Sequence, residues 1–108
     1  MTLGQKQEAF SRDLVKLLTK AFEMGYEVRI GEVMRGKAQQ EYYMRTGRTT
    51  TMRSLHLLKL AADLHFTRKG RLDYPTALGE YWESLDPKNE AGMFWKNFKD
   101  VAHFQRNL

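Results

Sequence analysis

The chain contains no cysteine among its 108 residues. This absence excludes disulfides, thiolate zinc sites and cysteine nucleophiles, so any metal in the protein must be held by nitrogen and oxygen donors. It is compatible with every redox compartment and identifies none. Histidine is also scarce, and the three imidazoles of the chain, His56, His65 and His103, are the candidates for a nitrogen-ligated site.

Long apolar runs are missing as well. Nowhere do apolar residues follow one another for long enough to span a bilayer. Residues 1–8 lack the apolar segment that a secretory signal requires. We therefore expect synthesis in the cytoplasm without a signal peptide, and no insertion into a membrane.

The length and composition that are present indicate one globular domain over residues 1–108. A hydrophobic content of 42% separates this sequence from disordered chains. The formal net charge of +5 suggests an acidic partner. Nucleic acid and the anionic bacterial wall both meet that description, and charge alone does not choose between them.

We expect three helices, the first and the third from apolar spacing of three and four residues. They cover Leu3–Met24, which Gly25 ends, then the short segment Ala38–Met44, and finally Tyr74–Leu85. For the first helix, a position on a membrane surface is the alternative, but its ordinary apolar stripe favours core packing. Gly79 costs about 1 kcal/mol relative to alanine inside the third helix, which predicts close packing against a neighbour.

Alternating apolar and polar residues predict strands between these helices. Tyr26–Ile30 is typical of a half-buried strand, and Leu60–Phe66 of a central one. Arg68–Arg71 is typical of a hairpin turn. We further predict a loop at Lys88–Gly92 and a final strand-like segment at Trp95–Gln105.

Two pairs of residues carry the candidate chemistry. His56 and Asp63 stand seven positions apart, and Asp100 precedes His103 by three. Two imidazoles, one carboxylate and a second carboxylate as base are the composition of a catalytic zinc site with one open position. Taken singly, each of these residues is more simply a packed histidine or a solvated carboxylate.

Together, these residues resemble a known family. Ser54-x-His56, then Asp63, closed by Asp100-x-x-His103 and a phenylalanine, is similar to the zinc D,D-peptidases and endolysins of the M15 peptidase family (the LAS group). The likeness extends upstream to residues 31–40, which resemble the arginine-then-glutamine segment of that family, and to residues 48–54. The size and the order of the blocks most resemble the phage L-alanyl-D-glutamate endopeptidases.

This resemblance implies a role for each matching residue. Zn²⁺ is expected to be bound by His56, Asp63 and His103 and to activate a water molecule. Asp100 is then the general base, because it matches the Asp-x-x-His of the family. Arg35 matches the arginine that stabilises the developing oxyanion.

Other matches and departures are less specific. Gln40 and Ser54 match positions linked to substrate binding, although either is equally suited to ordinary hydrogen bonding. His65 shares a strand face with Asp63. A ligand role in place of Asp63 is the alternative, but the family pattern does not call for one there, so we expect His65 to orient the site or simply to pack. The family often has glycine where Lys59 stands, and Trp-Gly-Gly where Ala91–Met93 stands. Such differences affect the walls of the site more than its ligands.

We therefore predict an α+β fold of the Hedgehog and DD-peptidase type, with helices packed on a small, mainly antiparallel sheet and zinc at the edge of that sheet, facing a cleft. The implied activity is hydrolysis of an amide bond in the peptidoglycan stem peptide, between L-Ala and D-Glu. A D-Ala-D-Ala carboxypeptidase or dipeptidase is the alternative. We expect a monomer, made in the host cytoplasm and acting at the bacterial cell wall after release by another factor.

A different class of function starts from the basic charge. Tyr42 and Tyr43 stand near Arg45, Arg48 and Arg53, so that aromatic rings would stack on bases and arginines meet phosphates. A small nucleic-acid-binding module is therefore the rival hypothesis. The chain has no helix-turn-helix or zinc-finger spacing and its charges are dispersed, so we expect no nucleic-acid partner.

Overall fold

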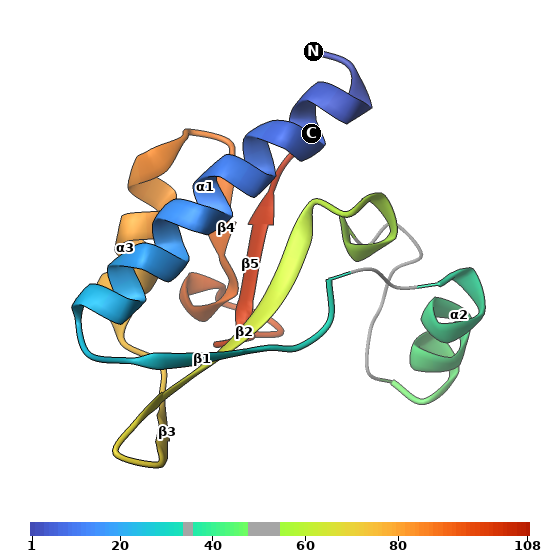
Figure 1. The fold of residues 1–108 in the computed structure, drawn as a ribbon. Coiled ribbons are helices and arrows are strands. Elements are labelled where there is room, and N and C mark those ends of the chain that lie inside the picture. Colours follow the sequence, from blue (N-terminus) through green and yellow to red (C-terminus); the bar gives the residue numbers. More distant parts are fainter. Residues whose placement is uncertain (34–35, 48–54) are drawn as a thin grey trace.

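The computed structural model describes residues 1–33, 36–47 and 55–108 (Figure 1). Three α-helices, five strands and two short 3₁₀ helices are present in this part of the chain. In chain order they are α1 (Leu3–Glu23), β1 (Glu27–Ile30), α2 (Lys37–Arg45), η1 (Leu55–Leu58), β2 (Ala61–Arg68), β3 (Arg71–Asp73), α3 (Thr76–Leu85), β4 (Asn89–Ala91), η2 (Gly92–Phe94) and β5 (His103–Arg106).

The strands form one sheet in the order β1-β2-β5-β4, with β3 paired to β2. Every pairing within it is antiparallel. The first half of β2 pairs with β5, which places Asp63 opposite His103, and its second half pairs with β1. The predicted α+β fold with a small antiparallel sheet is confirmed.

One face of this sheet carries the hydrophobic core. Ala62, Leu64 and Phe66 alternate along β2 into the core, where Phe104 of β5 and Trp82 of α3 are also buried. The helices α1 and α3 pack on each other and cover this face (Figure 1). The intervening residues of β2 and β5 therefore point to the opposite face.

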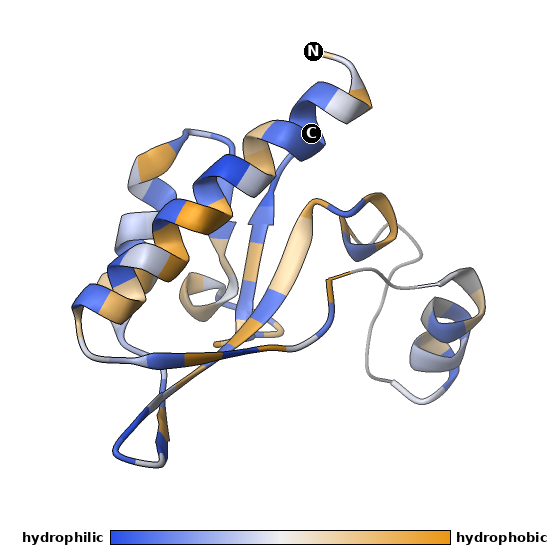
Figure 2. Ribbon diagram, in the orientation of Figure 1, coloured by the Kyte–Doolittle hydropathy of each residue, from blue (hydrophilic) through white to orange (hydrophobic). Residues whose placement is uncertain are grey.

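The sequence explains why α1 begins and ends where it does. Thr2 and Gln5 form a capping box at its start, which satisfies two backbone N–H groups. Gly25 has a φ of +88° just after its end, a conformation that glycine adopts without a steric penalty. Hydrophobic and hydrophilic residues are interspersed along the helix (Figure 2), as expected for a helix that packs one side against a sheet.

Near the C-terminus, two predictions were wrong. The expected loop at Lys88–Gly92 contains β4, a strand of three residues that is too short to show a period of two. The expected strand over Trp95–Gln105 is mostly turn, and only its end forms β5. Phe98 has a φ of +54° within this turn, which is incompatible with an extended strand.

The close packing predicted for Gly79 is confirmed. An added Cβ at Gly79 would lie 2.5 Å from the sulfur of Met93 and 3.0 Å from the ring of Phe94. Helix α3 can therefore approach the η2 segment closely only because this position has no side chain. That approach fixes the start of the turn that leads to β5.

Candidate metal centre

His56 enters the site from η1, the 3₁₀ turn just before β2. Its side chain is buried, and its Nδ1 lies 3.3 Å from the carbonyl oxygen of Val33 and 3.8 Å from a carboxylate oxygen of Glu32. A carbonyl oxygen only accepts hydrogen bonds, so the proton of the neutral imidazole belongs on Nδ1. The other nitrogen, Nε2, lies 3.4 Å from Asp63 Oδ1.

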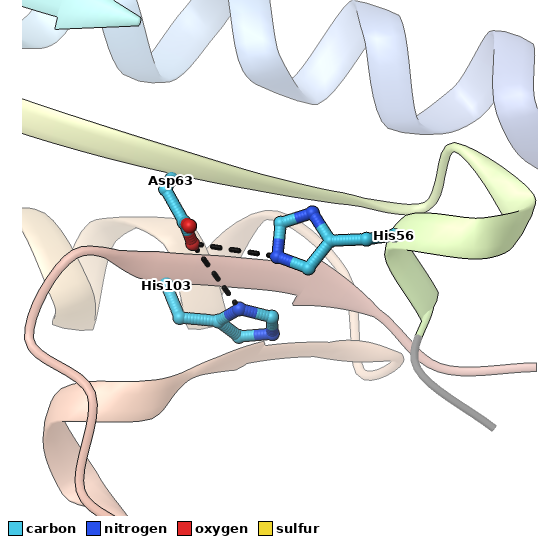
Figure 3. A group of neighbouring side chains, drawn as sticks. All are labelled: His56, Asp63 and His103. Atoms are coloured by element: carbon cyan, nitrogen blue, oxygen red, sulfur yellow. Dashed lines mark ion pairs between the residues drawn. The ribbon is translucent and has the colours of Figure 1, made fainter. Parts of the chain in front are cut away.

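Asp63 and His103 reach the same point from neighbouring strands. They are directly opposite each other in the pairing of β2 with β5, on the face away from the core. Asp63 Oδ1 lies 3.4 Å from His103 Nδ1 (Figure 3). One ligand atom from each of His56, Asp63 and His103 lies within 4.8 Å of the others, so these three side chains can hold a metal ion.

The Asp63 carboxylate shows why a cation suits this point. Its Oδ1 is buried, and within the described part of the chain it has no hydrogen-bond partner of acceptable geometry. A buried carboxylate oxygen without a partner is costly. Two imidazoles and a carboxylate form a donor set typical of catalytic zinc, with the fourth position left for water or substrate. The donors therefore fit a divalent cation.

Contacts within this group shift the pKa values of Asp63 and His103. Burial favours the neutral form of Asp63, but contacts with the imidazoles of His103 and His56 outweigh it and hold the pKa of this carboxyl well below its usual range. Burial likewise lowers the pKa of His103, yet contacts with Asp63 and Gln105 and the charge of Asp100 raise it overall. The carboxylate is thus ionised and ready to bind a cation.

Asp100 lies beside the group without being part of it. Its side chain is exposed in the turn before β5, where Oδ1 accepts a hydrogen bond from the Ala102 N–H at 3.2 Å. Its own N–H donates to the Gly92 carbonyl at 3.1 Å. The carboxylate is close enough to His103 to influence its pKa. This position, next to the cation-binding atoms and open to solvent, is the one that a general base requires.

Gly92 holds the Asp100 turn against β5. An added Cβ at Gly92 would lie 2.5 Å from the backbone oxygen of Asp100 and 3.1 Å from the Cβ of His103. No side chain fits there, so the turn can pack on the backbone of η2 only because this residue is glycine. The glycine therefore positions both Asp100 and His103.

The structure does not describe every predicted site residue. Arg35 and Ser54 lie outside the described residues. Gln40 is in α2, which stands apart from the sheet (Figure 1), and its side chain is likewise outside the description. The prediction of a site at the edge of the sheet was wrong, because Asp63 and His103 lie on the two central strands.

His65 faces the same side of β2 as Asp63, as predicted, but has a different partner. Its Nδ1 lies 2.6 Å from the hydroxyl oxygen of Tyr74. In the described part of the chain, the group of side chains that could hold a metal ion consists of the other two histidines and Asp63. The expected packing role of His65 therefore agrees with its contacts.

Sequence reasoning missed the residues that hold His103. Its Nε2 lies 2.7 Å from the side-chain oxygen of Gln105, and the ring of Trp95 lies with its centroid 5.0 Å from that of the imidazole. Gln105 stands two residues after His103 on the same strand, so the alternation of a strand would have placed both on one face. The contact of Trp95 crosses the turn and has no such signal.

No protein-family model matches the chain. Over 97 residues, or 85% of its length, the chain is 31% identical to the L-alanyl-D-glutamate peptidase of Listeria phage A118, and it spans 34% of that relative. The crystal structure of the Serratia marcescens L-Ala D-Glu endopeptidase ChiX matches 96% of this chain and 85% of that one, with a TM-score of 0.70 and 24% identity. The predicted resemblance is confirmed.

The likeness to ChiX shows the shared fold, and the phage relative extends the resemblance to the sequence. Because the chain spans about a third of the phage relative, activity and substrate do not follow from the match itself. Within the described residues, no helix combines the length and the apolar character needed to cross a membrane.

Proposed function

We propose that this chain is a zinc-dependent peptidoglycan peptidase that hydrolyses the amide bond between L-Ala and D-Glu of the stem peptide. The observation that carries the proposal is the convergence of His56, Asp63 and His103 on one buried carboxylate oxygen that lacks a hydrogen-bond partner among the described residues. The sequence match to an L-alanyl-D-glutamate peptidase supports the choice of bond.

Each residue of the site has a chemical task in this proposal. His56 Nε2, Asp63 Oδ1 and His103 Nδ1 would hold the ion. Zn²⁺ bound there would supply Lewis-acid polarisation of the scissile carbonyl and a lowered pKa for a water molecule. Asp100 takes a proton from the attacking water and passes it to the leaving amine.

The remaining predicted residues act on the substrate. Arg35 stabilises the negative charge that develops on the carbonyl oxygen during attack, since a guanidinium is charged at every physiological pH. Gln40 and Ser54 bind the stem peptide through hydrogen bonds. The net charge of +5 favours encounter of the monomer with an anionic wall, an effect that salt weakens.

Digestion of purified peptidoglycan tests the proposal. The protein is incubated with and without a chelator, zinc is added back, and the fragments are analysed by mass spectrometry. The expected result is zinc-dependent release of fragments with a new D-Glu amino terminus. Release of terminal D-Ala would instead identify a D-Ala-D-Ala carboxypeptidase. Cleavage that persists in the chelator, or no cleavage with zinc, would contradict the proposal.

A further inference from the structure

A chain of hydrogen bonds leads away from His103 on the face of the sheet that bears the metal centre. His103, Gln105 and Asn107 stand at every second position along β5 and beyond it, so their side chains share one face. Glu90 of β4 is directly opposite Gln105 in the strand pairing. All four side chains are buried or half-buried. A contact between two donors or between two acceptors is costly in such a place, because it leaves polar groups unsatisfied.

The contacts run from one side chain to the next. Gln105 presents its oxygen to His103 Nε2 at 2.7 Å, and its NH₂ group donates to Asn107 Oδ1 at 2.7 Å. The NH₂ group of Asn107 donates to one carboxylate oxygen of Glu90. The other oxygen of Glu90 accepts from the indole N–H of Trp95 at 3.0 Å. Because the Trp95 ring packs on the imidazole of His103, the circuit closes on itself.

The polarity of this circuit is set at one end. A glutamate carboxylate at neutral pH only accepts hydrogen bonds, so Asn107 must turn its NH₂ group toward Glu90. Its oxygen then faces Gln105, which must in turn direct its NH₂ group to Asn107 and its oxygen to His103. An oxygen at this position requires a proton on His103 Nε2, and the lone pair of the neutral ring is left on Nδ1.

We infer that Glu90 determines, through the side-chain amides of Asn107 and Gln105, which nitrogen of His103 carries the proton and therefore which nitrogen binds the metal. This inference rests on the proposed function in that it concerns the metal centre. Glu90 is a positioning residue, two amides removed from the ligand. Its role resembles that of carboxylates that fix the tautomer of a metal-bound histidine directly, but it acts here over three hydrogen bonds.

The substitution Glu90→Gln reverses the circuit without removing a contact. A glutamine can accept from the Trp95 indole with its oxygen and donate to Asn107 with its NH₂ group, so both amides turn over and His103 Nε2 becomes an acceptor. The Nδ1 atom then carries the proton and faces Asp63. We expect zinc affinity to fall by about 10–100-fold, the range typical of lost second-shell partners.

A double variant, Glu90→Gln with Gln105→Glu, distinguishes the direction of the hydrogen bonds from the packing of the side chains. A carboxylate at position 105 accepts the His103 Nε2 proton directly, so the double variant regains most of the zinc affinity although position 90 stays neutral. The matched control is Glu83→Gln. Glu83 also contacts β4, by accepting from the Ala91 N–H at 3.0 Å, and a glutamine oxygen keeps this bond. The control retains the zinc affinity of the unaltered protein.

The experiment combines zinc competition titrations with long-range ¹H–¹⁵N spectra of His103 in the zinc-free protein, at a pH where the imidazole is neutral. Asp63 faces His103 Nδ1 in every variant, so differences between the variants report the polarity at position 105. The fraction of the Nε2–H tautomer is expected to be higher in the unaltered protein and in the double variant than in Glu90→Gln. An Nε2–H ring with unchanged affinity in Glu90→Gln, or a folded double variant that does not recover, would overturn the inference. If the unaltered protein binds no zinc, the proposed function fails, while the tautomer still decides the role of Glu90.

Discussion

Asp63 and His103 face each other across the β2–β5 pair, with Asp63 Oδ1 3.4 Å from His103 Nδ1. Cross-strand neighbours of this kind have their Cβ atoms about 4.5–5.5 Å apart, so that short side chains meet directly. The relative position of these two side chains is therefore set by the backbone pairing of the two central strands. Only His56 is contributed by a less regular element, the 3₁₀ turn η1.

Removal of the charged oxygen from this pair should abolish tight metal binding. Asp63→Asn keeps the shape of the side chain but replaces the ionised oxygen with an amide. We expect zinc affinity to fall by more than about 100-fold, beyond the 10–100-fold range of second-shell changes. Competition with a chromophoric chelator measures it. The matched control is His65→Phe on the same face of β2, which should bind zinc normally. Tight binding by Asp63→Asn would exclude this carboxylate as a ligand.

Asp100→Asn should separate catalysis from metal binding. Loss of a general base costs about 10²–10⁴-fold in turnover, whereas the three proposed ligands remain. Because the charge of Asp100 raises the pKa of His103, that pKa should also fall in the zinc-free variant. Turnover on purified peptidoglycan and an NMR titration of the imidazole check the two effects. Normal turnover would remove Asp100 from the mechanism.

Gly92→Ala should destabilise the fold next to the metal centre. The added methyl group meets the backbone oxygen of Asp100 at 2.5 Å, and backbone cannot move aside as a flexible side chain does. Overpacking of this kind costs about 1–3 kcal/mol in the free energy of unfolding. Denaturant unfolding measures it. Gly4→Ala in the first turn of α1 is the control, since its added methyl group would lie 3.9 Å from the Thr2 hydroxyl, an ordinary contact, and should be neutral or stabilising. Equal stability of the two variants would show that the contact at Gly92 is easily relieved.

Lys59→Gly should stabilise the protein. Lys59 stands between η1 and β2 with a φ of +56°, and the left-handed region costs a non-glycine residue about 1–2 kcal/mol. Glycine removes this strain but loses about 0.5–1 kcal/mol through the greater entropy of the unfolded chain. The net gain is about 0–1.5 kcal/mol by these two estimates. Lys59→Ala removes the same side chain without relieving the backbone, so a rise in Tm for alanine equal to that for glycine would contradict the explanation.

The parts of the fold that were predictable have strong local signals. The apolar stripe of α1 and the stop at Gly25 mark a long helix, and the apolar run of β2 marks a central strand. The order of His56, Asp63 and His103 along the sequence was sufficient, through family resemblance, to single out the three residues that the structure brings together.

What was not predictable depends on contacts between distant segments. The strand β4 is three residues long and exists because β5 and α3 flank it. The turn before β5 follows from the packing of Gly92 on the backbone of Asp100, which no local pattern encodes. Glu90 lies opposite Gln105 because of the register of β4 and β5, and this register is fixed by the whole sheet.

The proposed metal centre can be tested with a crystal of the zinc-loaded protein and anomalous data recorded at the zinc absorption edge. We expect one anomalous peak per chain, with His56 Nε2, His103 Nδ1 and an oxygen of Asp63 at about 2.0–2.2 Å from it. A peak elsewhere on the chain, or none between these three side chains, would contradict it.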